Sequence, residues 1–153
     1  MDKDDVIDTL NTLIETSKDG EYGFTACAEH VRSATVRQIF AARAMECREG
    51  ALELQRLVRE YGGEAEDEGS VSGAMHRGWV SVKGTLAGYS DLAMLEECER
   101  GEDAAVARYR KALQQELPAD VLMVVQRQMS GVQRNHDQIR RLRDEAREHE
   151  HGG

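Results

Sequence analysis

The stretch LEECERGEDAAVARY, residues 95–109, lies at the centre of the pattern that decides the fold. Apolar side chains recur around and within it at alternating steps of three and four residues, which is the spacing of the buried face of an amphipathic helix. The members of this stripe are Leu92, Leu95, Val106, Tyr109 and Leu113. The same count lands on Glu99 and Glu102, so the pattern predicts two carboxylates on an otherwise apolar face.

Three further stripes with the same alternation flank this segment, which itself predicts a helix from about residue 91 to about 115. One predicts a long helix over about 4–32, although the weak helix former KDGEYG at 18–23 leaves two shorter helices as an alternative. The next covers 36–61 and stops at Gly62-Gly63, which is a helix C-cap signal. The last follows Pro118, a residue suited to the first position of a helix.

The lengths of the connections predict how these helices are arranged. The first two helices are joined by a short turn, as are the last two, so each pair is expected to be antiparallel. The segment 62–90 is long enough to cross the bundle, and a short amphipathic helix is expected within it at about 71–87. The prediction is an all-α, ferritin-like antiparallel four-helix bundle, with a single domain over 1–147 and a polar tail at 148–153.

Composition narrows the classes of function. The chain has 153 residues, one proline and a net charge of −9, which argues against binding to nucleic acid or to an anionic membrane surface. It contains no apolar run near the ~20 residues of a membrane span, and no phosphate-binding loop, nucleophile elbow or Cys-x-x-Cys motif. Three cysteines without a disulfide-like spacing suit reduced thiols, so a cytoplasmic protein is expected.

Several stretches resemble known helical proteins. VIDTLNTLI at 6–14 and MECREGALELQRLVREYGG at 45–63 resemble helices of bacterioferritins. LNTLIETSKDGEYGFTACAEHV at 10–31, together with GEDAAVARYRKAL at 101–113, is similar to an uncharacterised bacterial family of ferritin-like four-helix-bundle proteins, a domain of unknown function. This resemblance covers nearly the whole chain and implies a fold, but it implies little about function.

The bacterioferritin resemblance also implies where a di-iron centre would lie. Such centres take a glutamate from each of two helices and a Glu-x-x-His motif from each of the other two. In this chain the first-helix position is Ser17, the second-helix motif is Glu46-x-x-Glu49, and the fourth-helix motif is Gln133-x-x-His136. The third helix keeps Glu97, Glu99 and Glu102. Because ligands are missing or altered on three helices, the resemblance implies a degenerate site without an intact ferroxidase centre.

Folding the helices back flush predicts which residues share a layer. Residue 17 should lie level with about 48, and residue 99 level with about 133, which gathers polar side chains near mid-height. One interpretation is a metal site for iron, manganese or zinc, whose ligands would be Glu21, Glu99, Glu102 and His136. The alternative is a structural layer in which Glu99 and Glu102 pair with His136 and with arginines such as Arg43.

The sequence thus predicts a ferritin-like helical-bundle protein that is non-catalytic and carries a degenerate di-iron-type site. The alternative is a metal-binding protein that uses the central Glu/His layer and retains some redox activity. No catalytic residue is predicted. Self-association into a homo-oligomer is left open, and the sequence identifies no protein partner.

Overall fold

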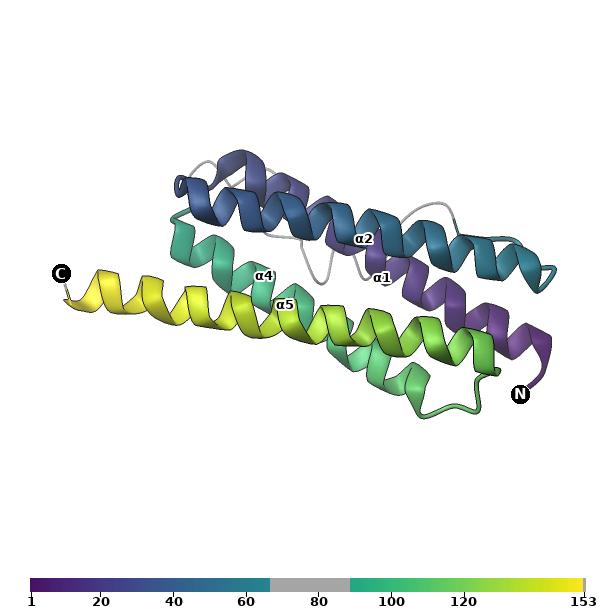
Figure 1. Ribbon diagram of the computed structural model, residues 1–153. Coiled ribbons are helices and arrows are strands. Elements are labelled where there is room, and N and C mark those ends of the chain that lie inside the picture. Colours follow the sequence, from purple (N-terminus) through teal and green to yellow (C-terminus); the bar gives the residue numbers. More distant parts are fainter. Residues whose placement is uncertain (67–88, 153) are drawn as a thin grey trace.

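The computed structural model describes residues 1–66 and 89–152, which form four long helices and their connections (Figure 1). The helices are α1 (Lys3–His30), α2 (Ala34–Glu60), α4 (Asp91–Leu113) and α5 (Ala119–Gly152). The all-α prediction is confirmed, and so is the single first helix, because α1 continues without a break through the weak stretch at 18–23. The short helix expected at 71–87 lies outside the described residues.

Local side chains explain where the helices begin. Asp2, Ser33 and Ser90 are the N-cap residues of α1, α2 and α4, and the side chain of each accepts a hydrogen bond from the amide three residues ahead. The last helix starts one residue later than predicted. Pro118 precedes it, and its carbonyl accepts a 2.8 Å hydrogen bond from the Leu122 amide.

The end of α2 follows from its two glycines, as predicted. Gly62 has a φ of 81°, a left-handed conformation that glycine adopts without a steric penalty. The Gly62 amide donates to the Arg59 carbonyl and the Gly63 amide to the Val58 carbonyl, each at 3.0 Å. These two bonds form a Schellman motif, which satisfies carbonyl groups that the helix end would leave unpaired.

Contacts at the two ends of the bundle confirm the crossover. At one end, the Asp91 carboxylate accepts hydrogen bonds from the amides of Arg32 and Ser33, at 2.8 and 2.9 Å, so α4 begins against the α1–α2 turn. At the other end, the Tyr61 hydroxyl donates to Asp120 at 2.8 Å, so α2 ends where α5 begins. The chain between α2 and α4 therefore travels the length of the bundle, as expected for two antiparallel pairs with one long connection.

The predicted register of α5 against α4 is wrong, however. Residue 99 was expected level with about 133, yet Glu99 pairs with Arg143, and His136 pairs with Asp103. The displacement along α5 is ten residues, or about 15 Å at 1.5 Å per residue. Its cause is the connection at 114–118, which runs along the bundle before α5 starts, so that α5 begins beyond the end of α4 (Figure 1).

Two further observations concern α5 and the chain as a whole. α5 continues to Gly152, so residues 148–152 of the expected polar tail are helical. Within 1–66 and 89–152, no helix combines the length and the apolar character that crossing a membrane requires.

Candidate functional site

The apolar core of the bundle is divided into two clusters. One joins the first half of α1 to the second half of α2, and the other joins the second half of α1 to the first half of α2. Polar side chains are buried around the boundary between them: Thr16, Ser17, Asp19, Arg43, Glu102, Asn135 and His136. Burying polar groups costs free energy unless they find partners, so this layer is the place to look for a site.

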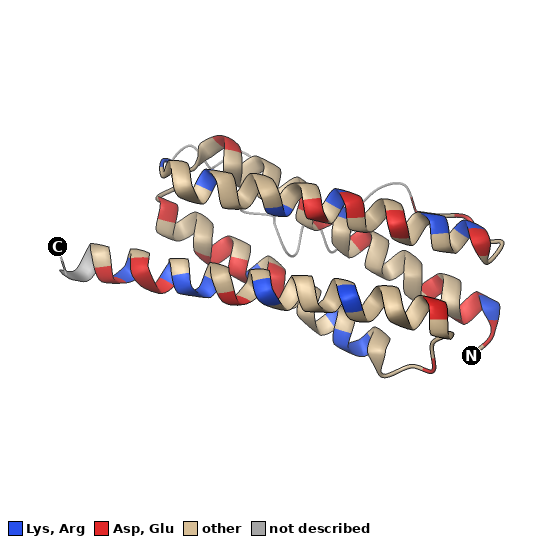
Figure 2. Ribbon diagram, viewed as in Figure 1, with Lys and Arg blue, Asp and Glu red and all other residues tan. Residues whose placement is uncertain are grey.

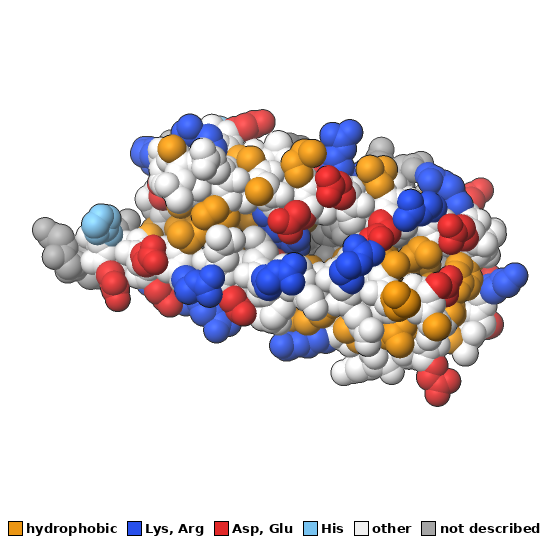
Figure 3. Space-filling view, viewed as in Figure 1, with side chains coloured by type: hydrophobic (Ala, Val, Ile, Leu, Met, Phe, Trp, Pro, Cys, Tyr) orange, Lys and Arg blue, Asp and Glu red, His pale blue; other side chains and the backbone are white. Residues whose placement is uncertain are grey.

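A cavity of about 540 Å³ occupies this layer, and all four helices line it. It opens between α2 and α5, because the exposed residues of its lining all lie on these two helices. Acidic residues of α2 and basic residues of α5 lie along this side of the bundle (Figure 2), and their side chains flank the opening (Figure 3). The charged lining residues are Asp19, Arg43, Glu46, Glu49, Glu53, Glu102, Arg108, Arg127 and Arg134.

An ion pair between Arg43 of α2 and Glu102 of α4 lies deep in the cavity. Nε of Arg43 donates to Oε1 of Glu102 at 3.1 Å, and the two side chains are only 8% and 3% exposed. Nη1 of Arg43 also donates to Glu46 at 3.3 Å, although Glu46 is largely exposed. Of the structural alternative, in which Glu99 and Glu102 pair with His136 and with arginines such as Arg43, the structure contains the arginine pairing of Glu102, whereas His136 contacts Asp103 instead.

Burial and neighbouring charges shift the pKa values of Arg43 and Glu102 in opposite directions. Burial lowers the pKa of Arg43, but Cys47, Glu102 and Glu46 outweigh it, so the pKa is raised and the guanidinium stays charged. Burial raises the pKa of Glu102, and Arg43, a hydrogen bond with Asn135 and the nearby His136 offset only part of that effect. Oε2 of Glu102 is buried and has no hydrogen-bond partner among the described residues.

Two other groups that line the cavity are chemically quiet at neutral pH. Burial raises the pKa of the Cys47 thiol to about 12 and that of the Tyr109 hydroxyl to about 12. Since the thiolate is the nucleophile and metal ligand, a protonated Cys47 is poor in both roles. The three cysteines, Cys27, Cys47 and Cys98, are all free and buried.

One edge of the cavity is closed by a chain of hydrogen bonds across three helices. The Tyr109 hydroxyl donates to the side-chain oxygen Oε1 of Gln128 at 2.8 Å, and the side-chain nitrogen Nε2 of Gln128 donates to Glu53 at 2.9 Å. Arg127 forms an ion pair with the same carboxylate. These contacts tie α2, α4 and α5 together beside the opening.

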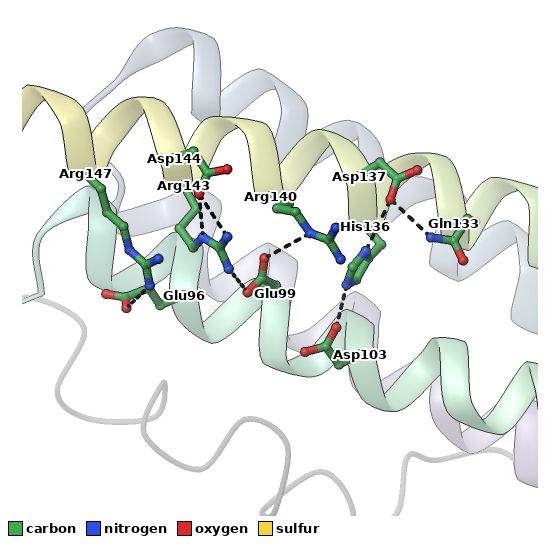
Figure 4. Close-up of polar contacts among 10 residues, drawn as sticks. All are labelled: Glu96, Glu99, Asp103, Gln133, His136, Asp137, Arg140, Arg143, Asp144 and Arg147. Carbon is green, nitrogen blue, oxygen red and sulfur yellow. Dashed lines mark hydrogen bonds and ion pairs between the residues drawn. The ribbon is translucent and has the colours of Figure 1, made fainter.

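The structure distributes the four predicted metal ligands among different partners, and only Glu102 lines the cavity. Glu99 pairs with Arg143, and its other oxygen lies 4.0 Å from Nε of Arg140 (Figure 4). Glu21 is half-buried on α1.

His136, the fourth predicted ligand, is buried at the α4–α5 contact. Its Nε2 lies 2.5 Å from Asp103 and its Nδ1 3.4 Å from Asp137 (Figure 4). In the part of the chain that the structure describes, no group of three or more His, Cys, Asp or Glu side chains is arranged to hold a metal ion. A metal site built from Glu21, Glu99, Glu102 and His136 therefore stays a prediction.

The positions that correspond to bacterioferritin ligands also separate in space. Ser17, Glu46 and Glu49 line the cavity. Gln133 instead donates to Asp137 at 3.1 Å, and His136 contacts Asp103. The motif on α5 is thus engaged at the α4–α5 contact and is not among the residues that line the cavity.

Asp103 is a site residue that the sequence did not indicate. Its contact with His136 depends on the register of α5, and no spacing in the chain reports that register. Arg43 did carry a signal, because it lies three residues after Phe40 and four before Cys47, on the buried stripe of α2.

A sequence family matches this chain, and solved structures share its fold. The sequence profile of a family described as a domain of unknown function, DUF2383, matches residues 5–115. No curated protein matches the chain in sequence.

Two solved structures share the fold. The chain is similar to the dodecameric thioferritin characterised as the bacterioferritin-related protein of Bacteroides fragilis, with a TM-score of 0.77, 18% identity, and 98% of this chain and 91% of that chain covered. It is also similar to a mutant of Dps1 from Mycobacterium smegmatis, with a TM-score of 0.72, 12% identity, and 92% and 96% covered. Likeness at this identity shows a ferritin-like fold and nothing finer.

Proposed function

The chain belongs to the DUF2383 family, and we propose that it is a non-catalytic ferritin-like bundle in which an ion pair stands where a metal centre would be expected. In this proposal the Arg43–Glu102 pair fixes the middle of the bundle, and the protein neither oxidises nor stores iron. Its function would then depend on binding at its surfaces and in its cavity.

The observation that carries the proposal is the buried guanidinium of Arg43. A di-iron centre concentrates several carboxylates and imidazoles around two cations. Here Glu102 already shares its charge with a cation 3.1 Å away, and that cation would repel a metal ion at the same carboxylate. Ser17 offers a hydroxyl where the resemblance places a carboxylate, and His136 is engaged by Asp103. The residues present therefore do not fit a di-iron centre.

Metal analysis tests this proposal. The protein is treated with chelator, incubated anaerobically with ferrous iron, manganese or zinc, desalted, and assayed for metal. The expected result is far less than one ion per chain, with no rapid, saturable oxidation when ferrous iron is added in air. Retention of one or more ions per chain, abolished by Glu102→Gln but not by removal of residues 148–153, would overturn the proposal.

The second candidate is a metal-binding protein that uses Glu21, Glu99, Glu102 and His136. One observation favours it: Oε2 of Glu99 and Oε2 of Glu102 are both buried without a hydrogen-bond partner among the described residues. An imidazole with several carboxylates would suit iron, manganese or zinc. In that case the bound metal would raise the melting temperature, and His136→Ala would abolish the rise.

We include self-association in the proposal. The similar thioferritin is named as a dodecamer, and this chain exposes large hydrophobic side chains on three helices: Tyr22 on α1, Met45 and Leu52, seven residues apart on α2, and Met123 on α5. Light scattering behind a sizing column is expected to give several times the 17.1 kDa of one chain. A monomer at every concentration would remove this part of the proposal.

Two earlier expectations remain parts of the proposal. The first is a cytoplasmic location, which the three free, buried cysteines support. The second is a single domain over 1–147 followed by a short polar end at 148–153. Limited proteolysis tests the domain limits, and the expected product is one resistant core that has lost only its C-terminal end.

A further inference from the structure

The cavity between α2 and α5 has the size and burial of a site for a small molecule. Its volume of about 540 Å³ falls within the range of about 300–1,000 Å³ that is usual for such sites. Its deeper lining includes the buried side chains of Ser17, Arg43, Glu102 and Tyr109, which come from three different helices. Polar groups held in this way by several helices are oriented before any ligand arrives.

The two walls of the opening carry opposite charge. The α2 wall presents Glu46, Glu49 and Glu53, whereas the α5 wall presents Arg127 and Arg134. In Figure 3 acidic side chains on α2 and basic side chains on α5 face each other across the hollow between the two helices.

Most of these charged side chains already form ion pairs. The side chains that do not form one determine which ligand charges the cavity can bind. Glu53 pairs with Arg127, and Glu46 pairs with Arg43. Glu49 and Arg134 line the opening from opposite sides, and neither has an ion-pair partner within the described residues. One negative and one positive side chain without an ion-pair partner are thus left in the lining of the opening, one on α2 and one on α5.

The Arg43–Glu102 ion pair lies deeper in the cavity. Oε2 of Glu102 is buried and has no hydrogen-bond partner among residues 1–66 and 89–152. Because the guanidinium of Arg43 already balances this carboxylate, the pair adds little net charge to the cavity. The charge that remains without an ion-pair partner at the opening is therefore negative on the α2 side and positive on the α5 side.

We propose that this cavity binds a small zwitterion, such as an aliphatic amino acid with separated charges. Its ammonium group lies against Glu49, and its carboxylate lies against Arg134. A simple anion would meet the three glutamates of α2, and a simple cation would meet the arginines, so each is opposed by one wall. This inference does not depend on whether the bundle binds metal.

A ligand series with graded charge separation tests the proposal. Glycine, 4-aminobutyrate and 6-aminohexanoate are titrated into the full chain while backbone amide resonances are recorded by NMR. Butylamine and butyrate, which carry one charge each, are matched controls at the same ionic strength. The expected result is saturable shifts confined to residues that line the cavity, with an optimum chain length and an affinity about tenfold above that of either control.

Substitutions at the opening separate this site from general surface binding. Glu49→Gln and Arg134→Gln change exposed side chains, so the fold should persist, and each should weaken binding about tenfold. Arg48→Gln, at an exposed position outside the cavity lining, should leave the affinity unchanged. Equal binding of butylamine or butyrate, no saturable shift with any member of the series, or unaltered affinity in Arg134→Gln would overturn the proposal.

Discussion

At the scale of single residues, Asp91 connects the start of α4 to the turn between α1 and α2. It is the first residue of α4, and its two carboxylate oxygens accept hydrogen bonds from the amides of Arg32 and Ser33 in the α1–α2 turn. We expect Asp91→Ala to lower the free energy of unfolding by about 1–2 kcal/mol, because both amides lose a charged acceptor. Urea denaturation measures this loss.

The control for this substitution is Asp8→Ala, at an exposed position of α1. The side chain of Asp8 has no hydrogen-bond or ion-pair partner among the described residues, so its loss should change stability by less than about 0.5 kcal/mol. Asp91→Asn should fall between the two, because it keeps one acceptor oxygen. Equal effects of Asp91→Ala and Asp8→Ala would show that the contact contributes nothing.

Glu53 gives a pH dependence with a definite sign. Burial raises the pKa of Glu53, but hydrogen bonds from Arg127 and Gln128 outweigh it, so the pKa lies below the ordinary value of glutamate. A carboxyl with a lowered folded-state pKa stabilises the fold above its unfolded pKa of about 4.3, and this contribution is lost as the pH falls through the folded-state value. Wild type should therefore exceed Glu53→Gln in stability at neutral pH.

That difference should shrink toward zero on acidification. Urea titrations of both proteins between about pH 7 and about pH 3 give the difference directly, and other titrating groups cancel in the comparison. A difference that stays constant, or grows as the pH falls, would mean that Arg127 and Gln128 do not favour the ionised carboxylate.

At the scale of elements, the approach of α1 to α2 depends on Gly20. A Cβ atom at this position would lie 2.8 Å from Sγ of Cys47, which is closer than such atoms approach in proteins. Gly20→Ala should therefore cost about 1–3 kcal/mol, despite the higher helix propensity of alanine. Thermal or urea unfolding of the variant measures this cost.

A double-mutant cycle identifies the cause of that cost. In a Cys47→Ala background the obstructing sulfur is absent, so Gly20→Ala should become neutral or stabilise by up to about 1 kcal/mol. Gly50→Ala is a matched control, because its nearest neighbour, Nε2 of Gln128, lies at an ordinary 3.5 Å. A cost of Gly20→Ala that is the same in both backgrounds would rule out the steric explanation.

The elements themselves were largely predictable, and the reason is local. Apolar residues at steps of three and four, a serine or aspartate cap and a Gly-Gly stop all act within a few residues, so α1 and α2 were placed to within about two residues. The candidate site was only partly predictable. Glu102 and Arg43 share the buried faces of their helices, so their pairing followed from spacing.

At the scale of the whole molecule, prediction failed where it required the register between helices. The partner of His136 is Asp103, and the partner of Glu99 is Arg143. Both depend on how far the connection at 114–118 runs along the bundle, and no periodicity encodes that distance. The layer predicted from a flush alignment therefore included Glu99 and His136, whereas the cavity takes Arg127, Gln128 and Arg134 from α5.

The C-terminal end of α5 is weakly held. In this register α5 extends along α4 toward the turn between α1 and α2 (Figure 1), where few of its side chains are buried. Ile139 is its last fully buried side chain among the described residues. Beyond it, the contacts to α4 include Arg143 with Glu99, and Arg147 with Glu96 at 3.1 Å, where the latter side chains are 45% and 41% exposed (Figure 4). Exposed ion pairs contribute about 0–1 kcal/mol each and are screened by salt.

Hydrogen exchange should therefore divide α5 into two regions. Amides of residues 141–149 should exchange faster than those of 121–139, because the apolar side chains that pack against the core there, Leu142 and Ala146, are only partly buried. Sodium chloride should accelerate exchange in the first region only, and Arg147→Gln should reduce that sensitivity, since it removes one of the screened pairs. If protection were uniform along α5, or salt affected both regions equally, the end of the helix would be held by apolar contacts and its ion pairs would be incidental.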